Sequence, residues 1–135
     1  MILIVCVDDH NGMMFNHRRQ SQDRILRADI LELTDGKKLW MNAYSRKQFA
    51  ESDAEKILVD ETFLDAAGDG EFCFVENADV SGCVERIEEI YLYRWNRDYP
   101  ADVYFPVDLS VWKCVETKEF AGSSHEKITR ERYTR

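Results

Sequence analysis

The stretch "ILIVCVDDHNG" at residues 2–12 decides the fold class, because a continuous apolar run ends there in a sharp break. Residues 2–7 are apolar without alternation and rich in β-branched side chains, which is typical of a strand buried on both faces of a sheet. The turn-forming residues 8–12 then end the strand. We therefore predict a sheet that is covered on both sides.

The spacing of apolar residues changes after Asp23. Leu26, Ile30 and Leu33 recur every three to four residues, which indicates an amphipathic helix with its apolar side toward the sheet. Asp23 or Ser21 is a suitable N-cap, and an Asp-Gly pair follows the last apolar residue as a stop signal. A helix is therefore expected directly after the first strand and its loop.

Strand-like segments alternate with helical or loop segments along the rest of the chain. This pattern predicts an α/β fold with a mostly parallel central sheet, helices on both faces and an antiparallel C-terminal strand pair, in one domain over residues 1–135. The last strand is low in apolar residues, so we expect a solvated edge position for it or a surface for a partner. The expected elements are strands at 38–42, 56–60, 72–76, 87–95, 112–120 and 126–134, and a second helix at 44–52.

The composition is that of an ordinary globular protein, with 44% hydrophobic and 33% charged residues. A net charge of −8 opposes binding to nucleic acids or anionic membranes through the overall charge. No apolar stretch approaches the roughly 20 residues that a membrane-spanning helix needs. The apolar N-terminus lacks a basic lead, so we interpret it as a strand and not as a signal peptide.

The four cysteines contain no C-x-x-C pair, and Cys6, Cys73 and Cys114 lie in apolar, strand-like runs. They are therefore expected to be free, small buried side chains in a reducing compartment. Together with the absence of a targeting signal, this predicts a cytoplasmic protein without contact to a membrane.

Four segments, in the right order, resemble the dihydrofolate reductase family. The first two are "IVCVDDHNGMMFN" (4–16) and "LTDGKKLWMNAYSRKQF" (33–49). The others are "KILV" (56–59) and "IYLYRWNRDYPADVYFPVDLSVWKCVETKEF" (90–120), which is similar to the family's C-terminal pattern. The resemblance covers nearly the whole chain and implies a dihydrofolate reductase-like fold. In that family the cofactor is NADPH and the substrate is a folate.

The resemblance also implies where the family's substrate-binding residues should stand, and this sequence differs at those positions. Leu26 replaces the helix carboxylate that holds the pterin ring, and Tyr93 replaces the threonine that supports this carboxylate. Ala54 replaces the arginine that pairs with the glutamate tail of folate. A working folate reductase is therefore not expected.

The family's phosphate-binding positions carry the wrong chemistry for NADPH. Glu76-Asn77 stand where paired glycines let the pyrophosphate approach the backbone, and Asp60-Glu61 stand where a hydroxyl and an arginine face the 2′-phosphate. Residues 42–45 include no positively charged side chain, although the family's motif has one in this segment. Carboxylates opposite phosphates repel them, so we expect no cofactor unless the chain is a divergent NADPH-dependent reductase after all.

Adjacent arginines lie at the lip of the predicted cleft. A gap-free count places Arg19, Gln20 and Ser21 at the family's apolar "LPW" segment, and arginine suits phosphate and carboxylate recognition. We therefore hypothesise that the altered cleft binds an anionic or polar small molecule, or a protein partner. Alternatively, the arginines are solvated or pair with nearby acids such as Asp8 and Asp23. The candidate ligand-binding residues are Arg18, Arg19, Gln20, Arg24, Asn42, Ser45 and Tyr93.

A new enzymatic activity in the same cleft is a third hypothesis. Its weak catalytic candidates are His17, as a general base, and Asp29, which lies one helical turn from Leu26. The sequence has no H-x-H-x-D-H or H-E-x-x-H motif, so no metal site is expected.

Overall fold

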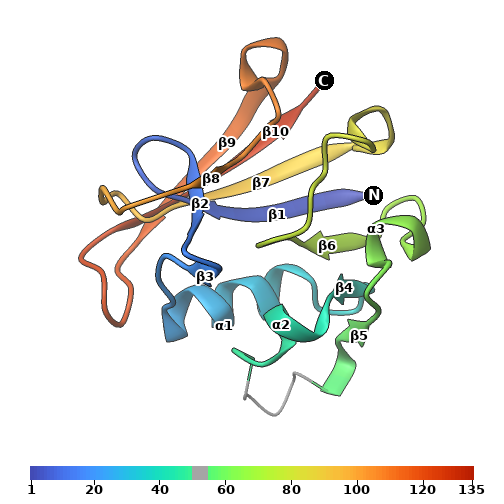
Figure 1. The fold of residues 1–135 in the computed structure, drawn as a ribbon, viewed down its shortest axis with the longest axis horizontal. Helices are drawn as coiled ribbons and strands as arrows, with labels where there is room; N and C mark the ends of the chain where they lie inside the picture. Colours follow the sequence, from blue (N-terminus) through green and yellow to red (C-terminus); the bar gives the residue numbers. More distant parts are fainter. Residues whose placement is uncertain (50–54) are drawn as a thin grey trace.

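The computed structural model describes residues 1–49 and 55–135, which contain a seven-stranded sheet with the order β5-β4-β6-β1-β7-β10-β9 (Figure 1). Neighbouring strands from β5 to β7 are parallel, and β10 pairs antiparallel with both β7 and β9. The predicted mostly parallel sheet with an antiparallel C-terminal pair is confirmed. The strands are β1 (Ile2–Val7), β4 (Leu39–Met41), β5 (Leu58–Val59), β6 (Phe72–Phe74), β7 (Glu89–Arg94), β9 (Lys113–Phe120) and β10 (Ile128–Thr134).

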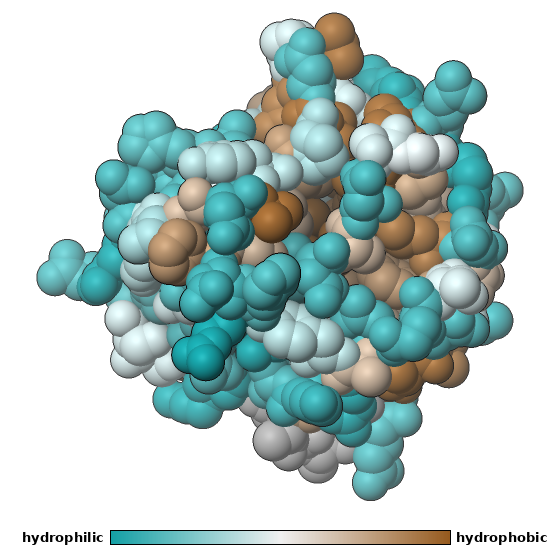
Figure 2. Space-filling model, viewed as in Figure 1, coloured by the Kyte–Doolittle hydropathy of each residue, from teal (hydrophilic) through white to brown (hydrophobic). Residues whose placement is uncertain are grey.

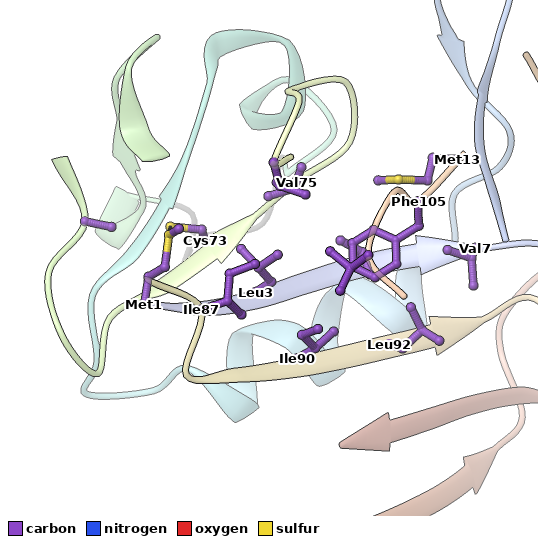
Figure 3. Close-up of a cluster of buried hydrophobic side chains, with 14 of the residues drawn as sticks. Met1, Leu3, Val7, Met13, Cys73, Val75, Ile87, Ile90, Leu92 and Phe105 are labelled. Atoms are coloured by element: carbon purple, nitrogen blue, oxygen red, sulfur yellow. Dashed lines mark hydrogen bonds between the residues drawn. The ribbon is translucent and has the colours of Figure 1, made fainter. Parts of the chain in front are cut away.

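Strand β1 is buried on both faces, as its apolar run predicts. Ile2 and Ile4 join a core cluster with Leu26 of helix α1 (Arg24–Leu33), whereas Leu3 and Val5 join a second cluster on the opposite face. Successive side chains of a strand point to opposite faces, so one apolar segment supplies two cores. Figure 3 shows part of the second cluster, in which Leu3 lies beside Ile87 and Ile90.

The helices cover the two faces unequally. The ten-residue helix α1 covers one face, and the four-residue helix α3 (Phe63–Ala66) and the 3-10 turn η2 (Val84–Arg86) contribute to the cover of the other. Helix α2 (Ala43–Arg46) is shorter than the predicted segment 44–52, of which residues 50–52 lie outside the described residues, as does Ala54. A further 3-10 turn, η3 (Leu109–Val111), precedes β9.

A small second sheet, which the sequence does not predict, has the order β3-β2-β8. Its strands are β2 (Gly12–Phe15), β3 (Arg18–Arg19) and β8 (Val103–Tyr104). Strand β2 directs Met13 and Met14 into the core, while Phe15 remains 47% exposed. The strands have only two to four residues, so no run of alternating side chains marks them in the sequence.

The main sheet ends in β5 on one side and in β9 on the other, and β10 lies between β7 and β9, which corrects the expectation of an edge position for the last strand. Polar residues of β10 are satisfied within the sheet: Arg132 pairs with Glu89, and Glu131 pairs with Arg94, in both cases at 2.6 Å. These pairs allow a strand with few apolar residues to occupy an interior position. Cys114 lies on the exposed edge strand, so the prediction of a buried thiol is wrong for this cysteine.

Hydrophilic residues cover most of the face seen in Figure 2, and hydrophobic residues gather over the segment that joins β6 to β7. Within the described residues, no helix has the length and apolar character to cross a membrane.

Candidate functional site

Leu26, at the position where the resemblance expects a carboxylate, lies in an apolar environment. It is 2% exposed and belongs to the cluster that contains Phe49, Phe74 and Tyr93. The Phe49 and Phe74 rings meet edge to face with centroids 5.5 Å apart. Leu26 cannot donate or accept a proton, so this position supplies no acid for a pterin ring.

Asp29 lies one turn further along α1 and is held by three donors. Its Oδ1 accepts from Lys118 Nζ at 2.8 Å, and its Oδ2 accepts from the Tyr93 hydroxyl at 2.5 Å and from Arg130 at 2.8 Å. Burial alone would raise the pKa of Asp29, but the Lys118 and Tyr93 hydrogen bonds and the nearby Arg130 outweigh it and lower that pKa. Asp29 is therefore an ionised anchor between α1 and the β9–β10 hairpin.

Arg19 forms a bidentate ion pair with Glu76, which lies two residues after the end of β6. Arg19 Nε and the second guanidinium nitrogen lie 2.9 and 3.1 Å from the two Glu76 oxygens, and the side chains are only 21% and 9% exposed. The guanidinium also lies 4.4 Å from the Tyr44 ring centroid, while the Arg19 N–H donates to the Tyr44 hydroxyl at 2.8 Å. This contact joins β3, α2 and the end of β6.

Polar groups at the start of α2 also have hydrogen-bond partners within the protein itself. Asn42 Oδ1 accepts from the Ser45 N–H at 3.0 Å, and Asn42 Nδ2 donates to Asn77 Oδ1 at 2.8 Å. The Glu61 carboxylate accepts from the Ala43 N–H at 2.8 Å. The Ala43 N–H thus already has a protein carboxylate as its acceptor, near a position where the resemblance expects a phosphate.

The remaining candidate ligand-binding residues of the loop do not point to one common site. Gln20 Nε2 donates to Asp8 at 3.1 Å, which ties this loop to the end of β1. Arg18 and Arg24 are exposed, and Arg24 lies at the first position of α1, where its N–H donates to Ser123. The structure therefore joins Arg19 to Glu76 and brings Asn42 to Asn77, but it does not gather the arginines around one point.

His17 is exposed and lines a groove between the small sheet and the segment after β6. The groove has a volume of about 420 Å³ and is also lined by Met14, Asn77, Asp102 and Val103. A neighbouring pocket of about 130 Å³ shares Asn77 and Val103 and is otherwise mostly apolar. Among the described residues, no group of three or more His, Cys, Asp or Glu side chains is arranged to hold a metal ion.

A second polar cluster, which the sequence did not predict as a site, joins Asp23 to His125. Asp23 has no exposed side-chain surface, and its Oδ2 lies 2.9 Å from His125 Nδ1. His125 Nε2 lies 3.0 Å from the Ser21 hydroxyl and 3.1 Å from the Tyr99 hydroxyl. The pairing spans 102 positions, so no local motif could reveal it. The one local indication in the sequence is the turn of small residues before His125, which allows its backbone to lie close to the Asp23 carboxylate.

The electrostatics of this second cluster favour an ionised Asp23. Burial would raise its pKa, but the N–H groups of Ser123 and Ser124 and the His125 ring outweigh this effect and hold the pKa of Asp23 well below its usual range. Asp23 also caps α1 by accepting from the Ile25 and Leu26 N–H groups. A Cβ at Gly122 would overlap the Asp23 carboxylate, so glycine is needed for this contact.

The fold is similar to that of a dihydrofolate reductase from Enterococcus faecalis, solved in complex with NADP(H) and RAB-propyl. The TM-score is 0.69, with 16% sequence identity, and the match covers 99% of this chain and 95% of that chain. No family model matches the chain. No curated protein matches it either. The expected dihydrofolate reductase-like fold is therefore confirmed, and the likeness extends to the fold alone.

Proposed function

We propose that this chain is a cytoplasmic protein with a dihydrofolate reductase-like fold that does not reduce folate with NADPH and instead binds a polar small molecule. The observation that carries the proposal is the Arg19–Glu76 ion pair. Glu76 stands at the position where the resemblance expects the cofactor pyrophosphate. Its carboxylate and the guanidinium neutralise each other there, so a phosphate would have to displace one charge and face the other.

Two further observations support the loss of reductase chemistry. Leu26 is buried among apolar side chains, where the family's reaction needs a carboxylate. Glu61 accepts from the Ala43 N–H, so a second carboxylate stands near the expected phosphate positions. The first feature removes the acid that the family's reaction needs, and the second places a negative charge where the cofactor phosphates would bind.

The groove lined by His17, Asn77 and Asp102 is the site that we propose for the ligand. Asn77 Oδ1 already accepts from Asn42, which leaves the Asn77 Nδ2 group as the donor that it offers. Asp102 provides acceptor oxygens, and Met14 and Val103 provide apolar walls. This combination favours a flat polar ring that carries both an acceptor and a donor, such as an amino-substituted heterocycle.

The main alternative is a divergent NADPH-dependent reductase, which the fold similarity favours. The two are separated by thermal unfolding of the protein with about 1 mM NADPH, with and without dihydrofolate, alongside an assay of NADPH oxidation. A ligand at about 100 times its Kd stabilises a protein by about 2.7 kcal/mol. We expect no stabilisation and no oxidation. Stabilisation by NADPH would contradict the proposed loss of cofactor binding, and NADPH oxidation that requires dihydrofolate would establish the alternative.

The groove is tested with 2-aminopyrimidine as a probe, followed by ligand-observed NMR. We expect weak binding that Val103→Trp abolishes by filling the groove. The matched control is Val115→Trp, because Val115 lies on β9 and is equally exposed, at 45% against 44% for Val103. Binding that survives Val103→Trp, or that is lost equally in both variants, would contradict the groove as the ligand site.

A further inference from the structure

The Asp23–His125 cluster has the connectivity of an activated serine. Asp23 Oδ2 contacts His125 Nδ1 at 2.9 Å, and His125 Nε2 contacts the Ser21 hydroxyl at 3.0 Å. A nucleophile within hydrogen-bond distance of a base, and a base oriented by a third group, form the arrangement on which serine acyl transfer depends. None of these three residues lines the groove described above.

The direction of each hydrogen bond follows from the charge of Asp23. An ionised carboxylate only accepts, so the proton between Asp23 and His125 belongs to Nδ1. When the ring is neutral, Nε2 carries the acceptor lone pair, and the hydroxyls of Ser21 and Tyr99 both lie within donor distance of it. This is the tautomer that can remove a proton from Ser21.

The His125 ring is buried and held by packing, whereas the two residues that contact its Nε2 atom are partly exposed. His125 is 5% exposed and stacks on Trp95 with ring centroids 4.6 Å apart, which fixes the plane of the imidazole. Its backbone carbonyl accepts from the Gly122 N–H at 2.9 Å. Ser21 and Tyr99 are half-buried, so each of these residues is partly accessible to solvent. A base held in this way needs little reorganisation when it accepts a proton.

We propose that Ser21 is a nucleophile for small activated esters, with His125 as its general base and Asp23 as the residue that orients His125. Ser21 Oγ bonds to the ester carbonyl carbon as its proton moves to His125 Nε2. The C–O bond to the alkoxide then breaks, and the alkoxide leaves with that proton, which gives an acyl-Ser21. Water, deprotonated by the same Nε2, releases the carboxylic acid and restores the Ser21 hydroxyl.

Tyr99 supplies a donor to the oxyanion. Once Nε2 carries the proton from Ser21, it no longer accepts from Tyr99, whose hydroxyl is then available to the negatively charged carbonyl oxygen. The Tyr99 and Ser21 hydroxyls share Nε2 as a neighbour, which keeps them close to the same reacting group.

The test is covalent labelling of the full chain with a fluorophosphonate, followed by peptide mass spectrometry, together with hydrolysis of p-nitrophenyl acetate. We expect one adduct, on Ser21, and its loss in Ser21→Ala. Tyr99→Phe removes the oxyanion donor and keeps the ring, so we expect labelling to slow by about tenfold or more. The matched control is Ser110→Ala, because the Ser110 hydroxyl donates to Asp108 and has no histidine beside it.

His125→Asn keeps a polar side chain and removes the base, and we expect labelling to slow by at least about 100-fold in protein whose circular dichroism is unchanged. If that variant does not fold, Tyr99→Phe and Ser21→Ala still decide the question. Labelling of folded wild-type protein at Ser21 no faster than at Ser110 would overturn the proposal. Ester hydrolysis that Ser21→Ala leaves intact would overturn it as well.

Discussion

The contact between α1 and the C-terminal hairpin differs from the contact between β3 and the end of β6 in how a buried carboxylate is satisfied. Asp23 and Asp29 each receive donors from several side chains or backbone groups about 90 to 100 positions away. Glu76 is held chiefly by one partner, Arg19. The first contact distributes each charge over several donors and holds two segments of the fold together. In the second contact the carboxylate charge is balanced chiefly by one guanidinium, so removal of either partner leaves the other charge without compensation.

Asp23→Ala should be the most destabilising substitution. It would leave the N–H groups of Leu26, Ser123 and Ser124 and the Nδ1 atom of His125 without their acceptor. We expect a loss of about 4 kcal/mol in the free energy of unfolding, measured by urea denaturation. Asp23→Asn keeps an oxygen for the helix cap and should cost about half as much. A loss below about 1 kcal/mol in Asp23→Ala would show that the distributed contact does not stabilise the fold.

Glu76→Ala should cost about 3 kcal/mol, because it leaves the largely buried Arg19 guanidinium without its carboxylate. The double variant Arg19→Met with Glu76→Leu removes both charges and should be more stable than Glu76→Ala. A double-mutant cycle between Arg19 and Glu76 measures their coupling, which we expect to be about 1–3 kcal/mol. Additive single effects would mean that the two charges act independently and that this contact is not a closed pair.

Asp29→Asn should cost about 2 kcal/mol and should flatten the dependence of stability on pH. The folded pKa of Asp29 is lowered, so its contribution is complete above the unfolded pKa of about 3.9 and is lost as the pH falls through the folded value. Urea titrations between about pH 6 and pH 2 should therefore show a smaller decline in the variant than in the wild type. Parallel curves for the two proteins would contradict the role of Asp29 as an ionised anchor.

Lys127→Ala should change the free energy of unfolding least among these substitutions. Lys127 pairs with Glu119 at 3.2 Å, but both side chains are more than half exposed. Solvent and salt screen such a pair, so we expect a change within about 0.5 kcal/mol in the same urea titration. A loss as large as that of Glu76→Ala would remove the distinction between buried and exposed pairs.

Much of the fold could be predicted because its signals are local. The apolar run of residues 2–7 predicts a doubly buried strand, and the spacing of Leu26, Ile30 and Leu33 predicts the helix that packs on it. Short strands such as β3 and β8 carry no such signal, since two residues show no periodicity. The interior position of β10 was also missed, because its polar residues find partners on other strands that a linear pattern does not reveal.

For the candidate site, the sequence by itself supplied the argument for the proposed loss of reductase chemistry, and only the tertiary structure decided which contacts the residues at these positions make. A leucine cannot ionise, and an ionised glutamate repels phosphate, so the identities of Leu26 and Glu76 support the proposed loss of reductase chemistry. That Glu76 pairs with Arg19, and that His125 meets Asp23 and Ser21, depends on contacts between segments 57 to 104 positions apart. Hydrogen bonds act only over about 3 Å, so only the folded chain brings such partners together.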